Sequence, residues 1–253
     1  ILLGNGSDLV VTTGSGAGNI GVVAITGTSV EDVTLSAGTG NVTVGVIGAA
    51  AAQINDVTLS GTTINLGGNI NTDNDGTDLG DVDINGAVAL AAGVTIDTSA
   101  GDGTVNLSST VDNAQNFDIA SGAGAVVITG GIGLTTALTT LDINQGGGAG
   151  TITIDDIGDA GVGVTGATAI GNANTTNLTL GGAVYNTDGT QTYTAVAGNT
   201  IDLTAGATTT FTSTADAITF GTGTVELADG SNLSVTTGGG VGNIQLVAIK
   251  GSS

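Results

Sequence analysis

The sequence of 253 residues contains no cysteine, proline, histidine, tryptophan or methionine, and Lys250 is its single basic residue. Without cysteine the fold has no disulfides to rely on. Without histidine, cysteine and arginine, the usual catalytic triads, zinc sites and phosphoryl-transfer sites are excluded. The absence of proline fits a chain of mostly central strands, because a central strand must donate every hydrogen bond of its ladder.

Positive charge is almost absent as well. Asp and Glu number 22 against one Lys, which gives a net charge of −21 at pH 7. Nucleic-acid binding depends on neutralising phosphates with Lys and Arg, so no nucleic-acid partner is expected. The same charge argues against anionic membrane surfaces, and no apolar run approaches the roughly 20 residues of a membrane span. The balance favours solubility and the binding of cations.

What is present is glycine and small or branched apolar residues. Hydrophobic residues make up 40% of the chain, glycine occurs 47 times, and only five side chains are Phe or Tyr. The apolar residues alternate with polar ones in short runs such as 42–46, 126–128 and 152–154, which predicts half-buried strands. Between these runs lie clusters of Gly, Asn, Asp, Ser and Thr, which are typical of turns. No stretch has convincing helical spacing.

The predicted strands recur at a regular distance. Strand starts near Leu9, Val33, Val57, Val82 and Val105 lie about 24 residues apart, which suits one coil of a parallel β-helix with two or three strands. The expected fold is therefore all-β: a β-solenoid of about ten coils, each of about 24 residues, with no significant helix. At about 4.8 Å per coil the rod would be about 50 Å long. A β-sandwich would show no such period.

A much longer repeat is also present. Residues 6–27 and 230–251 match at 15 of 22 positions without gaps, at an offset of 224. We therefore expect 1–253 to be one continuous solenoid segment, in which 1–224 form one repeat unit and 225–253 begin the next, equivalent to 1–29. Two weaker echoes relate 33–44 to 117–128 and 95–103 to 200–208. Their offsets of 84 and 105 differ, so the internal repeat is degenerate.

Phrases such as VTLSAGTGNVTV (33–44), FDIASGAGAVVI (117–128) and TIDLTAGAT (200–208) resemble the β-strand-repeat regions of giant bacterial surface proteins. Those regions belong to filamentous-haemagglutinin-like and autotransporter-passenger-like adhesins, and the resemblance covers essentially the whole chain. It implies a right-handed parallel β-helix, secretion, and a structural or adhesive role. The secretion cap and translocator of such proteins are not seen here, which is expected of a segment taken from the middle of a longer chain.

One acidic segment is a candidate metal site. Residues 73–78 read Asp-Asn-Asp-Gly-Thr-Asp and are followed by Asp81 and Asp83. Alternating oxygen ligands around a central Gly allow a short loop to wrap a hard cation, so Asp73, Asp75 and Asp78 are the expected Ca²⁺ ligands. The alternative, and the favoured interpretation, is an acidic surface loop that keeps the rod soluble. Asp155–Asp156 with Asp159, and the loop 186–189, are interpreted as solvated turns.

Three functions remain open at this point. The first is an extracellular rod that belongs to a giant cell-surface adhesin or fibre. It is not expected to be an enzyme and requires no cofactor, with Ca²⁺ as the one candidate ligand. The second is a self-assembling subunit of a filament, sheath or surface layer. The third is a polysaccharide-active β-helix enzyme, since such chemistry needs only two carboxylates. The expected partners are neighbouring repeats or identical copies stacked end to end, and cell-surface glycans or other cells.

Overall fold

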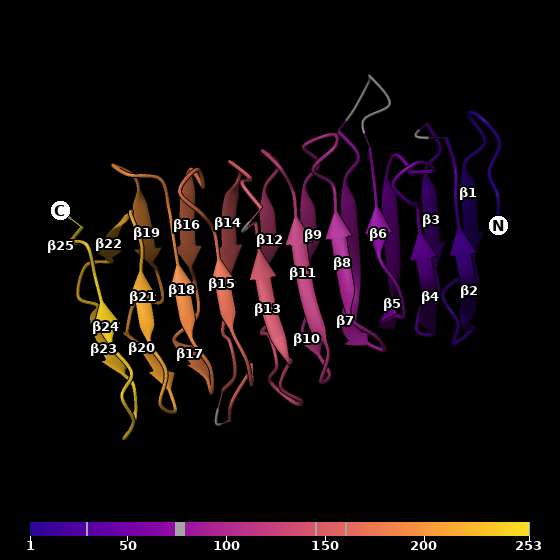
Figure 1. Ribbon diagram of the computed structural model, residues 1–253. Helices are drawn as coiled ribbons and strands as arrows, with labels where there is room; N and C mark the ends of the chain where they lie inside the picture. The colour runs from indigo at the N-terminus through magenta and orange to yellow at the C-terminus, as the bar shows by residue number, and fades with distance from the viewer. Residues whose placement is uncertain (29, 74–78, 145, 160, 253) are drawn as a thin grey trace.

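The computed structural model describes residues 1–28, 30–73, 79–144, 146–159 and 161–252. They form a single β-solenoid whose coils stack from one terminus to the other, so that the two termini lie at opposite ends of a rod (Figure 1). All strand pairings among the described residues are parallel. None of these residues is helical, including residues 48–55, the nearest approach to a helical pattern in the sequence. The predicted fold class is confirmed.

Each coil has three sides, called here the first, second and third face in the order in which the chain crosses them. The first face is built from β1 (Leu9–Thr12), β3 (Val33–Ser36), the first part of β5 (Val57–Leu66) and of β7 (Val82–Leu90), β9 (Val105–Leu107), β12 (Val126–Ile128), β14 (Thr151–Ile154), β16 (Asn177–Leu180), β19 (Thr200–Leu203), β22 (Thr224–Leu227) and β25 (Ile249–Gly251).

The second face contains the first part of β2 (Ile20–Ile25) and of β4 (Asn41–Ile47), the second part of β5 and β7, β10 (Val111–Asp112), β17 (Val184–Thr187), β20 (Thr208–Ser213) and β23 (Asn232–Thr236). Single bridges at Ile132 and Ile157 continue it between β10 and β17. The third face contains the ends of β2 and β4, then β6 (Ile70–Asn71), β8 (Val94–Asp97), β11 (Asn116–Ala120), β13 (Thr140–Ile143), β15 (Thr168–Ile170), β18 (Gln191–Tyr193), β21 (Ile218–Phe220) and β24 (Ile244–Gln245).

The register of the first face gives the length of a coil. Leu9 and Ile249 occupy the same column ten coils apart, so the mean coil is about 24 residues long. The step from Val105 to Val126 is the shortest on this face, and the step that follows it, from Val126 to Ile152, is as long as any. The corners between faces absorb this variation, since every inward-facing side chain keeps its place in the column.

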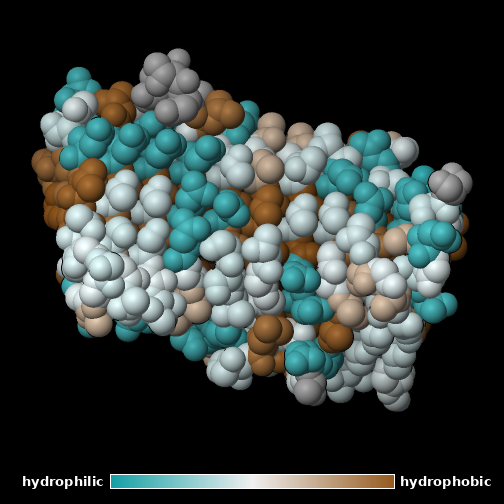
Figure 2. Space-filling model, turned by 180° about the vertical axis from the view of Figure 1, so that it is seen from behind, coloured by the Kyte–Doolittle hydropathy of each residue, from teal (hydrophilic) through white to brown (hydrophobic). Residues whose placement is uncertain are grey.

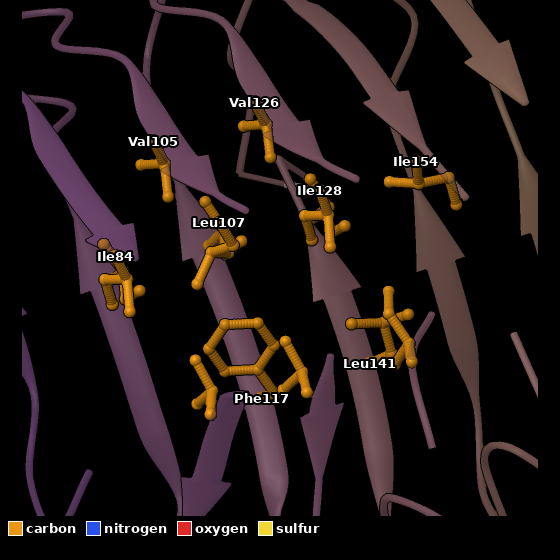
Figure 3. Packing of buried hydrophobic residues seen from close by; sticks show 14 of the residues in the cluster. Ile84, Val105, Leu107, Phe117, Val126, Ile128, Leu141 and Ile154 are labelled. Atoms are coloured by element: carbon orange, nitrogen blue, oxygen red, sulfur yellow. The ribbon is translucent and has the colours of Figure 1, made fainter. Parts of the chain in front are cut away.

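The core consists of columns of like residues, one from each coil, packed along the axis (Figure 3). β-branched side chains suit this arrangement because they are stiff and fit the pleated surface of a strand. Seven consecutive coils place isoleucine at one position of the third face, and none of the seven is more than 2% exposed: Ile25, Ile47, Ile70, Ile96, Ile119, Ile143 and Ile170.

One predicted alternation is wrong in detail. Val42 and Val44 point inward as expected, but Val46 is exposed and Ile47 is buried instead. The phase changes at Gly45, where a Cβ would overlap the carbonyl oxygen of Val23 on the neighbouring coil. The chain there passes from the second face to the third without a break in β4, so the period of two slips by one residue.

Candidate functional site on the faces and ends of the solenoid

The acidic loop predicted to bind calcium is only partly described. Asp73 is half-buried at the start of the loop, whereas Asp75 and Asp78 lie outside the described residues. The base of the loop is fixed, because the Thr72 hydroxyl donates to the carbonyl of Gly80 at 2.5 Å. Among the described residues no group of three or more acidic, His or Cys side chains could hold a metal ion. Calcium binding by this loop remains a prediction.

Asp81 belongs to a different feature, a ladder of four aspartates along the corner that precedes the first face. Asp8 accepts a hydrogen bond from the backbone N–H of Asp32 at 3.0 Å, and Asp32 from that of Asp56 at 3.2 Å. Asp56 in turn accepts from the N–H of Asp81 at 2.8 Å, and Asp81 from that of Thr104 at 2.6 Å. Each carboxylate thus satisfies a backbone donor of the next coil.

This ladder was missed in the sequence, although its signal was present. Asp8, Asp32, Asp56 and Asp81 each stand one residue before a first-face strand, at the same spacing that identified the coils. Their hydrogen bonds run along the axis, between consecutive coils. The carboxylates therefore serve the stacking of the coils, and their charge lies along one edge of the rod.

A buried carboxylate, Glu31, holds the corner between the first two coils. Its two oxygens accept hydrogen bonds from the Thr28 hydroxyl at 2.6 Å, the Thr28 N–H at 2.5 Å and the Gly6 N–H at 3.1 Å. Burial by itself would raise the pKa of Glu31, but the hydrogen bonds from Thr28, Val30 and Gly6 outweigh it and lower the pKa. The group is therefore charged at neutral pH and fully enclosed.

Glu31→Gln is expected to reduce the free energy of unfolding at pH 7 by about 1–2 kcal/mol, because an amide NH₂ would face N–H donors and leave them unpaired. The carboxylate's contribution is fully present above its unfolded pKa of about 4.3 and is lost as pH falls through the lower folded pKa. Denaturant melts of both proteins between pH 7 and pH 3 should therefore converge at low pH. Glu226→Gln, a control that breaks the exposed ion pair with Lys250, should cost about 0–1 kcal/mol.

Two carboxylates stand side by side on the outside of the third face. Asp118 of β11 is directly opposite Asp142 of β13 in the parallel register. Burial raises the pKa of Asp118, since neighbouring strands remove water from one side of the group. A pair of carboxyl groups is the minimum that glycoside hydrolysis requires. The five aromatic side chains, which sugar-binding platforms use, are all fully buried and therefore do not line this face.

Asp118→Asn is expected to stabilise the protein at pH 7 by at most about 1 kcal/mol, because it removes a charge that the fold disfavours at a half-exposed position. An acid whose folded pKa is raised destabilises the fold above that pKa, and the loss disappears as pH falls through it. The difference in melting temperature between Asp118→Asn and the parent should therefore shrink towards pH 3. A variant that is less stable than the parent at pH 7 would contradict this assignment.

Asp155 and Asp156 follow the end of β14 at a corner, where the sequence pattern had indicated a turn. Burial and the neighbouring charge of Asp156 raise the pKa of Asp155. The Oδ1 atom of Asp156 accepts the N–H of Val184 at 2.8 Å, one coil further along. The turn predicted over 186–189 is shorter than expected, because Asn186 and Thr187 are the last residues of β17. Asp188 follows the strand and accepts the hydroxyl of Thr214. Residues 155–156 and 188–189 therefore lie at corners between faces.

A shallow groove crosses three coils at the corner between the third and first faces. Its lining includes Ser99, Asp102, Gly122 and Asn144. Asp102, the one carboxylate of the lining, accepts the N–H of Ala123 at 2.6 Å. Asn144 is bonded to Ser121 through both atoms of its amide. These polar groups are used in holding the coils together, so the groove presents no pair of groups set for acid–base catalysis.

The two ends of the solenoid carry most of its exposed large apolar side chains. Figure 2 shows hydrophobic surface gathered at the N-terminal end, at the left of that view. The open strand edges of β1 and β2 lie at this end, and those of β23, β24 and β25 at the other. The exposed apolar residues of the two ends are Ile1, Leu2, Val10 and Val23, and Val241, Ile244, Val247 and Ile249.

No helix able to cross a membrane occurs in the part of the chain that the structure describes. Comparison with protein-family models, with curated proteins and with solved structures gave no match.

Proposed function

We propose that this chain is a segment of a non-catalytic structural or adhesive rod, displayed outside a bacterial cell by a giant repetitive surface protein. The observation that carries the proposal is a stack of about ten coils in which residues 6–27, at one end, and residues 230–251, at the other, are identical at 15 of 22 positions. Such a stack is lengthened by adding coils and needs no new fold. A rod that extends reach from a surface is the use that this property best serves.

The mechanical argument begins with the hydrogen bonds. Each coil pairs its backbone with the coil before and the coil after, and the aspartate ladder adds side-chain bonds in the same direction. Stability is then roughly a sum of terms for each coil and for each contact between neighbours. A chain without cysteine can therefore be stiff over a long distance.

The surface chemistry is consistent with an extracellular location. A net charge of −21 on 253 residues keeps neighbouring rods apart and keeps the rod away from nucleic acids. Divalent cations could bridge the acidic corners of two rods. The proposed partners are further repeats along the axis, and glycans or other cells on the faces.

A filament subunit is the second candidate, and the exposed apolar residues at both ends favour it. A head-to-tail polymer of short chains and a tandem array within one long chain would build the same rod. Denaturing electrophoresis of native material distinguishes them: chains of megadalton size support the surface-protein stalk, and a discrete short band supports the subunit.

Antibodies raised against residues 1–253 test the location and the role together. On intact source cells, immunogold electron microscopy should place the label outside the cell and at a range of distances from its surface. Cells with the gene deleted should lose the label and adhere less to glycan-coated surfaces. Label confined to the interior of the cell would contradict the proposal.

A further inference from the structure

The two matching segments do not occupy equivalent places in the solenoid. Leu9 belongs to the first face, whereas its sequence equivalent Leu233 pairs with Thr209 on the second face. Likewise Ile20 belongs to the second face, and its equivalent Ile244 pairs with Ile218 on the third. The last matching strand moves from the third face to the first. The same sequence has therefore advanced by one face between its two occurrences.

The local conformation is nevertheless the same in both places. Gly6 and Gly230 have φ of +71° and +75°, and each is followed by a matching turn hydrogen bond, from Ser7 to Gly4 at 2.9 Å and from Ser231 to Ala228 at 3.0 Å. The next corner is also repeated. Thr13 donates to the carbonyl of Gly18 at 3.0 Å, and Thr237 to that of Gly242 at 3.2 Å. The sequence thus specifies a strand and a corner but not which face they occupy.

The length of the coil accounts for this shift. An offset of 224 in the sequence, divided by a mean coil of about 24 residues, is about 9.3 coils, which is nine coils and one face. The weaker echoes behave in the same way: residues 33–44 cross from the first face to the second, and their echo at 117–128 from the third to the first. The offsets of the internal repeat are unequal because similar sequences can occupy any of the three faces.

The N-terminal occurrence of the repeated segment shows which part of the chain covers such a segment inside the solenoid. Here the C-terminal coil means residues 228–252, and the N-terminal coil its equivalent, residues 4–28. Val42 and Ile47 pair with Ile20 and Ile25 of the N-terminal coil, which are 7% and 0% exposed. Ile244 and Ile249 of the C-terminal coil, which are the equivalents of Ile20 and Ile25, are 45% and 54% exposed.

We infer that the C-terminal coil is an interaction surface for a second unit of this same repeat. In the second unit, the segment equivalent to residues 33–47 pairs with the C-terminal coil of the first unit. Its register is the one in which residues 33–47 pair with the N-terminal coil within a single unit. Thr34 of the second unit then lies beside Ser234, as Thr34 lies beside Val10 within the chain. Each unit is rotated by a third of a turn relative to the one before, so a feature on one face recurs on all three faces within three units.

The inference rests on the proposed function in assuming that units follow one another, and it is tested in a two-unit chain. In this chain residues 30–253 are joined after residue 253, so that 225–253 take the place of 1–29 in the second unit. The native sequence has no cysteine, so an engineered pair can report one contact. Ser234→Cys in the first unit and Thr34→Cys in the second should form a disulfide on mild oxidation, seen as the loss of two free thiols without dimerisation.

Two controls define the result. Val10→Cys with Thr34→Cys in the single chain reports the equivalent pair inside the solenoid, and the two pairs should be oxidised to within about twofold of each other, since Cα atoms one coil apart suit a disulfide. Lys250→Cys with Thr34→Cys of the second unit is the pair that would meet if the second unit were not rotated, and it should stay reduced. Oxidation of this pair, or of the internal pair alone, would overturn the inference.

The unsubstituted two-unit chain gives an independent readout if the cysteine variants do not fold. Small-angle X-ray scattering should show a straight particle longer than the single chain by about 45 Å, which is about 9.3 coils at about 4.8 Å each. A flexible pair of separate rods would contradict the junction. This result concerns the junction alone, whereas the immunogold experiment concerns location and adhesion, so either can fail without the other.

Discussion

Phe211→Ala is expected to cost about 3–5 kcal/mol of the free energy of unfolding, the range found for removing a large aromatic side chain from a core. Phe211 is fully buried and contacts three other rings. It stacks on Tyr185 with centroids 4.7 Å apart and meets Tyr193 and Phe220 edge to face at 5.2 and 4.9 Å. Four rings from two consecutive coils are thus held in one cluster, and the cavity left by alanine would be shared by all of them.

Amide hydrogen exchange of Phe211→Ala should show a loss of stability first in the coils around the ring cluster, and only then across the whole chain. Because each coil contacts only its neighbours, opening should be greatest from β17 to the C-terminal end and small in the isoleucine-filled coils. Phe211→Leu is the matched control, since it keeps most of the volume and should cost about 1.5 kcal/mol or less. Equal and small losses for both variants would mean that the ring cluster contributes little.

Gly150→Ala should destabilise the protein by about 3 kcal/mol, the upper end of the range for inserting volume into a packed site. A Cβ at this position would overlap the carbonyl oxygen of Gly124 on the preceding coil, and one at Gly124 would overlap that of Gly103. The three glycines stack at one corner, where backbone lies directly on backbone. A side-chain rotation cannot relieve such a contact, so the coils themselves must move apart.

Gly16→Ala provides the comparison. A Cβ there meets nothing within 4 Å, so the change should be neutral or stabilise slightly by restricting the unfolded chain. Thermal unfolding followed by circular dichroism would measure both variants. Similar melting temperatures for Gly150→Ala and Gly16→Ala would show that the corner is not closely stacked.

Much of the fold could be predicted from the sequence because its physical signals are short-ranged and repeated. Alternating apolar residues gave the strands, and the recurrence of Leu9, Val33, Val57, Val82 and Val105 gave the coil, which the register confirms. The ring cluster could have been found in the same way, since Phe211 follows Tyr185 by one coil in the parallel register. Columns of this kind are read from spacing alone.

The exchange of faces was not predicted, because local sequence carries no mark of absolute position around the axis. The offset of 224 was visible, but it is nine coils and one face only for the mean coil length that the register gives, because a coil of about 25 residues would make it about nine whole coils. The role of the buried Glu31 was also missed: a single Glu beside Thr28 and Val30 resembles any solvated turn. Its carboxylate is identified only when the Gly6 N–H of the preceding coil is seen to bond it at 3.1 Å.

The most direct test of the stacked solenoid is a set of distances along one outward column of the first face. Thr34 is five coils from Thr153 and seven from Asp202 in the parallel register. Spin labels on cysteines at these positions should give separations of about 24 and 34 Å, increasing by about 4.8 Å per coil. Distances that do not grow with the number of coils would show that the chain closes into a compact globule instead.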